Sequence, residues 1–331
     1  MDPLVPSSFN HKFVVVNGNR IHYVDEGNSN KVVVCVHGFP DLWYGWRYQI
    51  PYLVSLGYRV IVPDVRGYGQ TDSPKVENKD IQKASTKSLL GDIIGVLDHE
   101  KINRAVWLGH DWGGSLVWRA ALWFPSYVIA VGAVCTPYSP TPSDPVRLSD
   151  IVVKHKNWLY QAWFRTRLAI EDLNSNTELF LTSVFRPYTD MARSSVFSTT
   201  VPLNQRTITS VKGIKRSSLI SQAELDYYVS EYKRHGFEGP LNQYKTHEVN
   251  WQEEYNAGFV GKVITVPTLM VTVGNDPALP ASFTKNMPNY LPNLTFRHVE
   301  HAGHWVLVEQ TNEVNPFFKE FLSKAFHPNK L

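Results

Sequence analysis

Cysteine is scarce in this chain: 331 residues include only Cys35 and Cys135. Both lie inside apolar runs, a placement typical of buried free thiols in a reducing compartment and not of a disulfide framework. We therefore expect no disulfide bond and a cytoplasmic location.

Long hydrophobic runs are absent as well. No stretch approaches the roughly 18 apolar residues of a membrane-spanning helix, so we expect no membrane span. The opening MDPLVPSSFN lacks the charged region followed by an apolar stretch that marks a signal peptide. The final tripeptide, NKL, differs in one residue from the peroxisomal address SKL, which leaves peroxisomal targeting open beside the cytoplasm.

Neither sign of charge dominates, since Lys and Arg number 33 and Asp and Glu number 30, with a pI of about 8.6. The densest basic stretch, KGIKR at 212–216, fits a solvated face, so we expect no nucleic-acid partner. His, Cys and Glu residues show no metal-ligand spacing, and GYGQTD at 67–72 lacks the lysine of a phosphate-binding loop. We therefore expect no metal and no organic cofactor.

The chain is rich in short Val-rich runs that end in Gly, Asp or Pro and alternate with segments of helical pattern. Such runs are typical of strands buried on both faces, and their alternation with helices indicates a parallel sheet. The composition, 43% hydrophobic and 13% aromatic, is that of a globular protein. The predicted strands lie within residues 31–40, 58–67, 105–111, 128–137, 263–277 and 294–305.

The strand pattern stops after Pro137 and returns near residue 263. We predict an α/β fold in which residues 1–138 and 261–331 form a mostly parallel sheet flanked by helices. Residues 139–260, crowded with aromatics, are predicted to form an inserted helical cap. Within this cap the polar stretch from Ser194 to Ser218 predicts a long loop.

The stretch GHDWGG at 109–114 has the shape of the nucleophile turn that many hydrolases build between a strand and a helix. Such turns usually carry Ser, but here the centre is Asp111. Gly109, Gly113 and Gly114 leave room for a tight turn that exposes the central side chain, so we predict Asp111 as the nucleophile. The alternative is that Asp111 only caps the following helix, although a cap would not need glycine on both sides.

An acid and a histidine follow the nucleophile, at the ends of later strands, in hydrolases with this turn. Asp276 ends the run TLMVTVGND, and His304 lies in EHAGHW after LTFRHVE. We predict Asp276 as the acid and His304 as the base. The alternative for Asp276 is a residue that caps its own loop. The other histidines are expected to be structural or at the surface, among them His22, His37, His99 and His298.

The stretch HGFP at 37–40 follows the first Val-rich run, where such hydrolases supply one of the two N–H groups that stabilise an oxyanion. The second N–H belongs to the residue after the nucleophile. We predict Phe39 and Trp112 as these oxyanion-hole donors, with a cis peptide between Phe39 and Pro40. An ordinary turn without a binding role is the alternative.

Five motifs in this order resemble those of the soluble epoxide hydrolases of the α/β-hydrolase fold, over nearly the whole chain: HGFPDLWYGWRYQIPYL, PDVRGYGQTDSP, GHDWGG, VGNDPALP and HAGHW. GHDWGG by itself is shared with haloalkane dehalogenases, whereas the combination is more specific. In that family two cap tyrosines hold the epoxide oxygen, in segments like LYQAWF and GPLNQY. The resemblance implies that these are Tyr160 and Tyr244, with ordinary aromatic packing as the alternative.

An ionised aspartate suits this chemistry, because it can displace a leaving group from saturated carbon without a base to activate it. The epoxide oxygen would take its proton from Tyr160 or Tyr244. Water activated by His304, which Asp276 orients, would then hydrolyse the ester and release a vicinal diol. The expected partners are therefore water and a small apolar epoxide. Aromatic residues expected either to bind this substrate or to pack the cap are Trp158, Trp163, Phe164 and Phe185.

Two alternatives from other classes stay open. A haloalkane dehalogenase uses the same Asp followed by Trp, but some of these enzymes have Asn in place of Phe39, and a halide needs N–H donors instead of phenols. A ligand receptor on the same fold would keep the pocket without turnover, which the intact nucleophile, acid and histidine disfavour. The sequence also leaves open which epoxide is natural, which carbon and enantiomer react, and whether the chain forms a homodimer.

Overall fold

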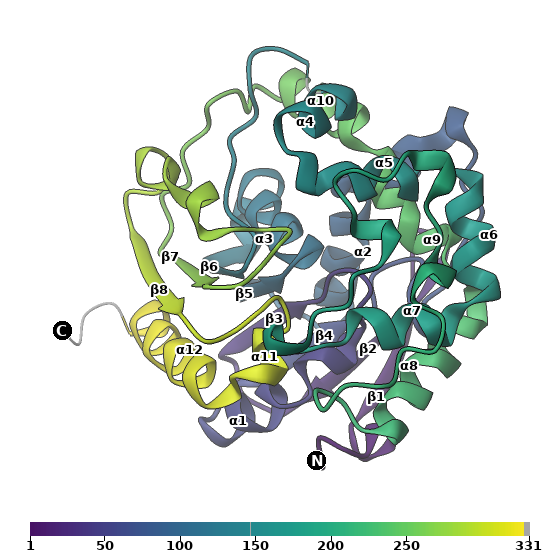
Figure 1. Cartoon of the computed structure of the whole chain (residues 1–331). Helices are drawn as coiled ribbons and strands as arrows, with labels where there is room; N and C mark the ends of the chain where they lie inside the picture. The colour runs from purple at the N-terminus through teal and green to yellow at the C-terminus, as the bar shows by residue number, and fades with distance from the viewer. Residues whose placement is uncertain (146, 328–331) are drawn as a thin grey trace.

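An eight-stranded sheet runs through the middle of the molecule (Figure 1). The computed structural model describes residues 1–145 and 147–327, and the NKL tripeptide at 329–331 lies outside the described residues. The strand order is β1-β2-β4-β3-β5-β6-β7-β8, with β3 to β8 parallel and β2 antiparallel to both neighbours. The mostly parallel α/β architecture is therefore confirmed. The strands are β1 (His11–Val16), β2 (Asn19–Glu26), β3 (Val32–Val36), β4 (Arg59–Pro63), β5 (Ala105–His110), β6 (Val128–Val134), β7 (Thr268–Val273) and β8 (Leu294–Val299).

The inner strands are mostly apolar because both of their faces are covered. Every residue of β3, β5 and β7 is buried, as expected of parallel strands between two helical layers. The first two strands lie outside the predicted pattern. They form an antiparallel hairpin at the sheet edge, and β1 has no buried residue, so it lacks a continuous apolar run.

Helices cover both faces of the sheet (Figure 1). Gly132 of β6 faces α12, since a Cβ added there would lie 3.5 Å from Phe321. The next residue, Ala133, faces α3, because a Cβ on Gly114 would lie 3.5 Å from it. Successive strand residues point to opposite faces, so α3 and α12 lie on opposite sides. The helices packed on the sheet or beside it are α1 (Gln49–Ser55), α2 (Thr86–His99), α3 (Trp112–Trp123), α11 (Val306–Glu309) and α12 (Thr311–Phe326).

Between β6 and β7 the chain forms an inserted helical region, drawn in teal to green in Figure 1. Its described part contains no strand, only a single bridge between Thr141 and Val260. The expected long loop from Ser194 to Ser218 contains no α-helix but includes three short 3-10 turns. No helix in the described ranges is long and apolar enough to cross a membrane. The inserted helices are α4 (Leu148–Lys154), α5 (Leu159–Phe164), α6 (Arg167–Ser175), α7 (Thr177–Val184), α8 (Gln222–His235), α9 (Glu238–Leu241) and α10 (His247–Asn256).

Helix α8 ties the inserted region to the segment that follows β3. Its first turn is closed by a capping box, in which Ser221 and Glu224 exchange side-chain to main-chain hydrogen bonds. Glu224 also forms a buried ion pair with Arg47, at 2.7 Å between Oε1 and Nη2. One turn later, the Tyr228 hydroxyl donates to Asp41 at 2.7 Å. These buried polar contacts fix where the inserted region lies relative to the sheet.

Candidate active site

The carboxyl ends of the parallel strands meet at one edge of the sheet, and the predicted catalytic residues follow three of these ends. Asp111 comes directly after β5, Asp276 lies three residues after β7, and His304 lies in the turn between β8 and α11. Because neighbouring parallel strands end at the same level, residues nearly 200 positions apart become neighbours.

The turn that carries Asp111 has φ 53° and ψ −124°, a conformation that L residues rarely adopt. Glycines make room for it: a Cβ on Gly109 would collide with the Gly113 carbonyl, and one on Gly113 with the Val36 carbonyl. The Thr136 hydroxyl donates to the Asp111 carbonyl at 2.6 Å. Asp111 occupies the N-cap position of α3, but its side chain makes no capping hydrogen bond. Helix capping therefore does not account for this aspartate.

The Asp111 carboxylate lies between a main-chain donor and an imidazole. The Phe39 N–H donates to Oδ1 at 2.8 Å, and His304 Nε2 lies 3.6 Å from Oδ2. Burial raises the pKa of this carboxyl above its ordinary value, while His304 and the N–H groups of Phe39 and Trp112 act to lower it. Both predicted oxyanion donors thus face the Asp111 carboxylate. The peptide between Phe39 and Pro40 is cis, as predicted.

Asp276 and His304 form a hydrogen-bonded pair, in which Nδ1–H donates to Oδ2 at 2.7 Å. The other oxygen of Asp276 accepts the N–H groups of Ala278 and Leu279 at 2.8 and 2.9 Å. Asp276 therefore caps its own loop and orients the histidine at the same time. Burial lowers the pKa of His304, but the charge and hydrogen bond of Asp276, followed by the charge of Asp111, raise it to about 9. The imidazole is protonated at neutral pH, between two carboxylates.

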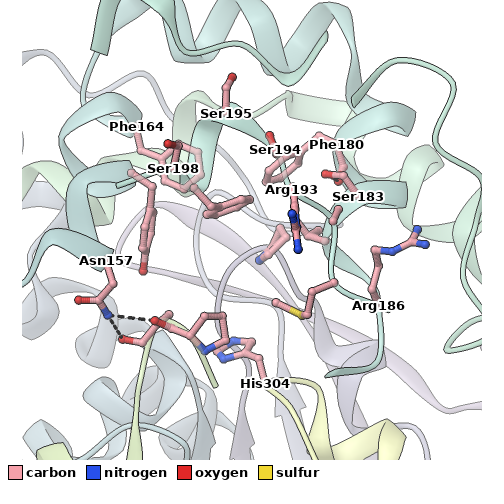
Figure 2. Close-up of a pocket in the computed structure, with 18 of the residues that line it drawn as sticks. Asn157, Phe164, Phe180, Ser183, Arg186, Arg193, Ser194, Ser195, Ser198 and His304 are labelled. Carbon is pink, nitrogen blue, oxygen red and sulfur yellow. Dashed lines mark hydrogen bonds between the residues drawn. The ribbon is translucent and has the colours of Figure 1, made fainter. Parts of the chain in front are cut away.

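A cavity of about 670 Å³ opens onto these side chains. Figure 2 shows His304 at one side of the cavity, with Phe164 and Phe180 at the other. Asp111 and Asp276 share the wall with His304, and the inserted region supplies most of the remaining wall. The predicted nucleophile, acid and base thus meet in one cavity.

Two tyrosines of the inserted region, Tyr160 in α5 and Tyr244 just after α9, also line the cavity. Their ring centroids are 6.2 Å apart. The Tyr244 ring contacts Phe39 and Trp112 edge-on, at 5.6 and 5.2 Å between centroids. Burial raises the pKa of both phenols, and the charge of Asp111 adds to the effect. Both hydroxyls therefore keep their hydrogens at neutral pH and can donate them to a ligand.

Of the four other aromatic residues predicted to contact substrate, Phe164 lines the cavity. Trp158, Trp163 and Phe185 lie one layer behind the described wall. The Phe185 ring, for example, packs on Trp305, which does line the cavity, with 4.5 Å between centroids. These three residues therefore pack behind the cavity wall, which is the alternative role that the sequence allowed for them.

The segment between α7 and α8, residues 185–221, supplies cavity residues that lie outside the sequence prediction. Met191, Arg193 and Phe197 belong to the wall, and Figure 2 shows Arg193 beside the cavity. The segment has six Lys and Arg against one Asp, whereas the net charge of the whole chain is +3. It has no helical or strand periodicity, so its basic composition was the only signal of a role. Of its basic residues, Arg186 and Arg193 line the cavity, and Arg186 forms an ion pair with Asp190.

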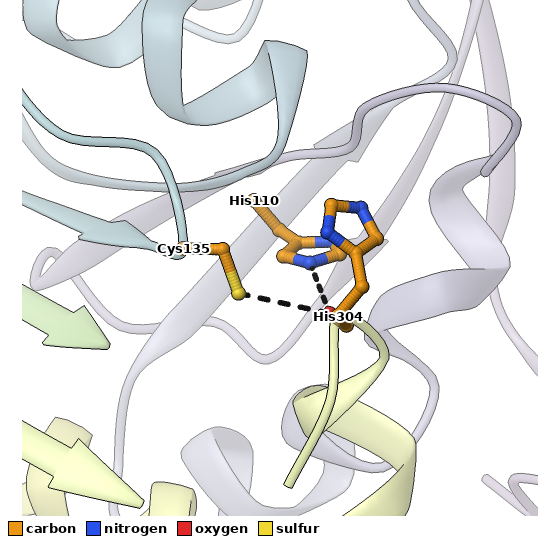
Figure 3. Close-up of side chains that lie close together, drawn as sticks. All are labelled: His110, Cys135 and His304. Atoms are coloured by element: carbon orange, nitrogen blue, oxygen red, sulfur yellow. Dashed lines mark hydrogen bonds between the residues drawn. The ribbon is translucent and has the colours of Figure 1, made fainter. Parts of the chain in front are cut away.

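Among the described residues, one group of side chains has ligand atoms close enough to hold a metal ion, namely His110, Cys135 and His304, whose atoms lie within 4.8 Å of one another (Figure 3). Apart from His110 Nδ1, these atoms already have partners. His110 Nε2 and Cys135 Sγ donate to the His304 carbonyl at 2.7 and 3.7 Å, and both ring nitrogens of His304 face carboxylates. We therefore assign no metal to this cluster, and the absence of a cofactor stays a prediction.

Some known proteins similar to this chain match it over nearly their full length, and others are considerably longer. The family model of the alpha/beta hydrolase fold matches residues 31–311. Epoxide hydrolase A of Mycobacterium tuberculosis is 35% identical over 321 residues, which cover 94% of this chain and 97% of that protein. Bifunctional epoxide hydrolase 2 of Rattus norvegicus is also 35% identical, over 97% of this chain, but the chain spans only 56% of its length.

Among solved structures, that of epoxide hydrolase A from Mycobacterium thermoresistibile is similar, with a TM-score of 0.80 and 30% identity over 95% of this chain and 98% of that one. Its similarity, like that of the Mycobacterium tuberculosis protein, spans nearly the full length of both partners. The resemblance inferred from the five motifs is thereby confirmed. The chain belongs to the epoxide hydrolases of the α/β-hydrolase fold.

Proposed function

We propose that this protein converts epoxides to vicinal diols in two steps, through an ester formed on Asp111. One arrangement above all supports the proposal: a buried carboxylate, two protonated phenols and a His–Asp pair line a single cavity. Carboxylate attack opens the ring, the phenols protonate the leaving oxygen, and the pair activates water. Residues 139–260 would act as the cap domain that encloses the substrate.

In the first step, an oxygen of Asp111 attacks an epoxide carbon while the ring C–O bond breaks. The imidazolium of His304, 3.6 Å away, keeps the carboxylate ionised, so no base is needed. The departing alkoxide takes a proton from Tyr160 or Tyr244. The resulting phenolate recovers its proton from the imidazolium, directly or through water, which leaves a hydroxyalkyl ester and a neutral His304.

In the second step, neutral His304 removes a proton from water, and the water oxygen attacks the ester carbonyl. Ester formation has removed the negative charge of Asp111, one of the groups that hold the His304 pKa near 9, so the neutral form is favoured. The N–H groups of Phe39 and Trp112 stabilise the oxyanion. When the acyl C–O bond breaks, the diol leaves, and the ionised Asp111 and protonated His304 are restored.

The two steps should therefore respond differently to pH. Alkylation needs no free base, so its single-turnover rate should change little from neutral pH to about 9. Ester hydrolysis needs neutral His304, whose pKa in the ester lies below the value of about 9 in the free enzyme, so its rate should rise with pH and level off below 9. Rapid-quench measurement of ester and diol tests this. A hydrolysis rate that is independent of pH, or that rises only above 9, contradicts the role given to His304.

The dehalogenase alternative is less well supported, because the cap offers phenols and not only N–H donors to a leaving group. The substrate favoured by the wall is an apolar epoxide. Arg193 lies in the basic segment 185–221 and would also accept an anionic group at the far end of such a molecule.

An assay of the purified protein with styrene oxide, a fatty-acid epoxide, its methyl ester and a haloalkane tests the proposed function. We expect diol from the epoxides, no halide release, and a higher kcat/KM for the acid than for its ester. Halide release at a comparable rate would indicate a dehalogenase, and no product from any compound would indicate a ligand receptor. Either result overturns the proposal.

The buried free thiols of Cys35 and Cys135 support a cytoplasmic location, which we propose as the site of action.

A further inference from the structure

We infer that His110 is a positioning residue for the catalytic histidine: it holds the main-chain carbonyl of His304 and so aims the imidazole at the Asp111 ester. The inference rests on the proposed function, because it concerns the second of the two proposed steps. His110 directly precedes the nucleophile in the chain, yet its contact is with a residue that lies 194 positions later.

The contact is short and buried. His110 is 1% exposed, and its Nε2 lies 2.7 Å from the His304 carbonyl oxygen. Figure 3 shows the Cys135 thiol converging on the same oxygen, at 3.7 Å. In the described chain, no main-chain N–H donates to this carbonyl, which lies between the end of β8 and the start of α11. His110 and Cys135 are therefore the groups that fix this point of the turn.

The carbonyl of His304, as the hydrogen-bond partner of His110, determines the tautomer and charge of the His110 ring. A carbonyl oxygen can only accept, so Nε2 must carry the hydrogen. The other nitrogen, Nδ1, is buried without a hydrogen-bond partner in the described residues, so no acceptor would stabilise a second proton on the ring. Burial, and then the charge of His304, lower the pKa of His110 to about 3. His110 is thus a fixed neutral donor throughout the range in which His304 changes its charge.

His304 consequently has two anchors. Its side chain is held at Nδ1 by Asp276, and its main chain is held at the carbonyl by His110. The rings of His110 and His304 also pack at 4.7 Å between centroids, which limits tilting of the catalytic ring. With both anchors present, Nε2 lies 3.6 Å from Asp111. Releasing the main-chain anchor would displace Nε2 from the water that attacks the ester, whereas attack by Asp111 on the epoxide would not need it.

Two amide substitutions separate this role from general packing. In His110→Gln the side-chain amide reaches about as far as Nε2 and can restore the donor. In His110→Asn the amide is one carbon shorter and reaches only the level of Nδ1, which has no partner. The measurements are the single-turnover rates of ester formation and ester hydrolysis, together with the thermal midpoint of each variant.

We expect His110→Asn to slow ester hydrolysis by roughly 10- to 100-fold, as displacements of about 1 Å do, while ester formation changes little. His110→Gln should recover most of the loss at a similar thermal midpoint. Equal rates for the two variants, or equal slowing of both steps, would overturn the inference. Failure of the wild-type protein to form any ester would instead overturn the proposed function.

Cys135→Ala keeps the inference testable if the His110 variants do not fold. It removes the second donor to the same carbonyl, so ester hydrolysis should slow by a few-fold and ester formation should not. A selective slowing of ester formation in this variant would contradict the assigned role of the carbonyl anchor.

Discussion

His304→Gln is expected to stop the reaction at the Asp111 ester. Alkylation uses the carboxylate itself and still proceeds, although more slowly without the imidazolium that keeps Asp111 ionised, whereas hydrolysis loses its base and should slow much more, by on the order of 10³- to 10⁴-fold, within the range of general base catalysis. Gln can still donate toward Asp276, so the loop is expected to keep its place. Intact-protein mass after mixing with substrate should increase by the mass of one epoxide.

The neighbouring His301 provides a matched control for this variant. It is exposed in the same turn, three residues before His304, so His301→Gln makes the same chemical change away from the cavity. This control should turn over normally and gain no mass. A His304→Gln protein that also gains no mass, or that loses ester as fast as the wild type, would show that His304 has a different role.

Substitution of the two cavity tyrosines, Tyr160 and Tyr244, is expected to give the second large effect on activity. Tyr160→Phe or Tyr244→Phe should each slow ester formation by on the order of 10²-fold, because each removes one acid from the leaving oxygen. The double variant should nearly abolish ester formation, since neither phenol remains to replace the other. Ester hydrolysis should change much less. Single-turnover rates of ester formation measure both effects.

Tyr255→Phe serves as the control, because Tyr255 lies in the same inserted region but is 47% exposed. It should leave both steps unchanged. An unchanged rate of ester formation in the double variant would mean that the leaving group needs no phenol, and it would favour the dehalogenase alternative over the epoxide one.

The sequence predicted the strands β3 to β8 and placed three candidate catalytic residues after strand ends. Strands buried on both faces must be continuous apolar runs, and residues that follow parallel strands share one edge of the sheet. Asp111 and Asp276 follow fully buried strands, His304 follows the partly exposed edge strand β8, and the glycines around Asp111 indicated its exposed turn. Local sequence patterns were therefore sufficient to predict that these residues, which are distant in the chain, lie close together in the fold.

The rest of the site depends on tertiary packing, which leaves no local pattern. Residues 185–221, which form part of the cavity wall, have neither helical nor strand periodicity, so only their basic composition distinguished them from an ordinary polar loop. The contact of His110 with the His304 carbonyl joins two strand ends, and nothing near His110 in the sequence indicates it. The hairpin was missed because β1 has no buried residue and the buried part of β2 includes His22 and Asp25, so neither strand is a continuous apolar run.

The most direct test of the account is where oxygen-18 goes in a single turnover. Enzyme in excess is mixed with epoxide in water enriched in oxygen-18, and the diol and the peptide that contains Asp111 are both analysed by mass. Through the ester, the new hydroxyl oxygen of the diol comes from Asp111, because water attacks the carbonyl carbon and the acyl C–O bond breaks. The account predicts an unlabelled first diol and a labelled Asp111. A labelled diol with an unlabelled Asp111 would show that water attacks the epoxide directly, and it would remove Asp111 as the nucleophile.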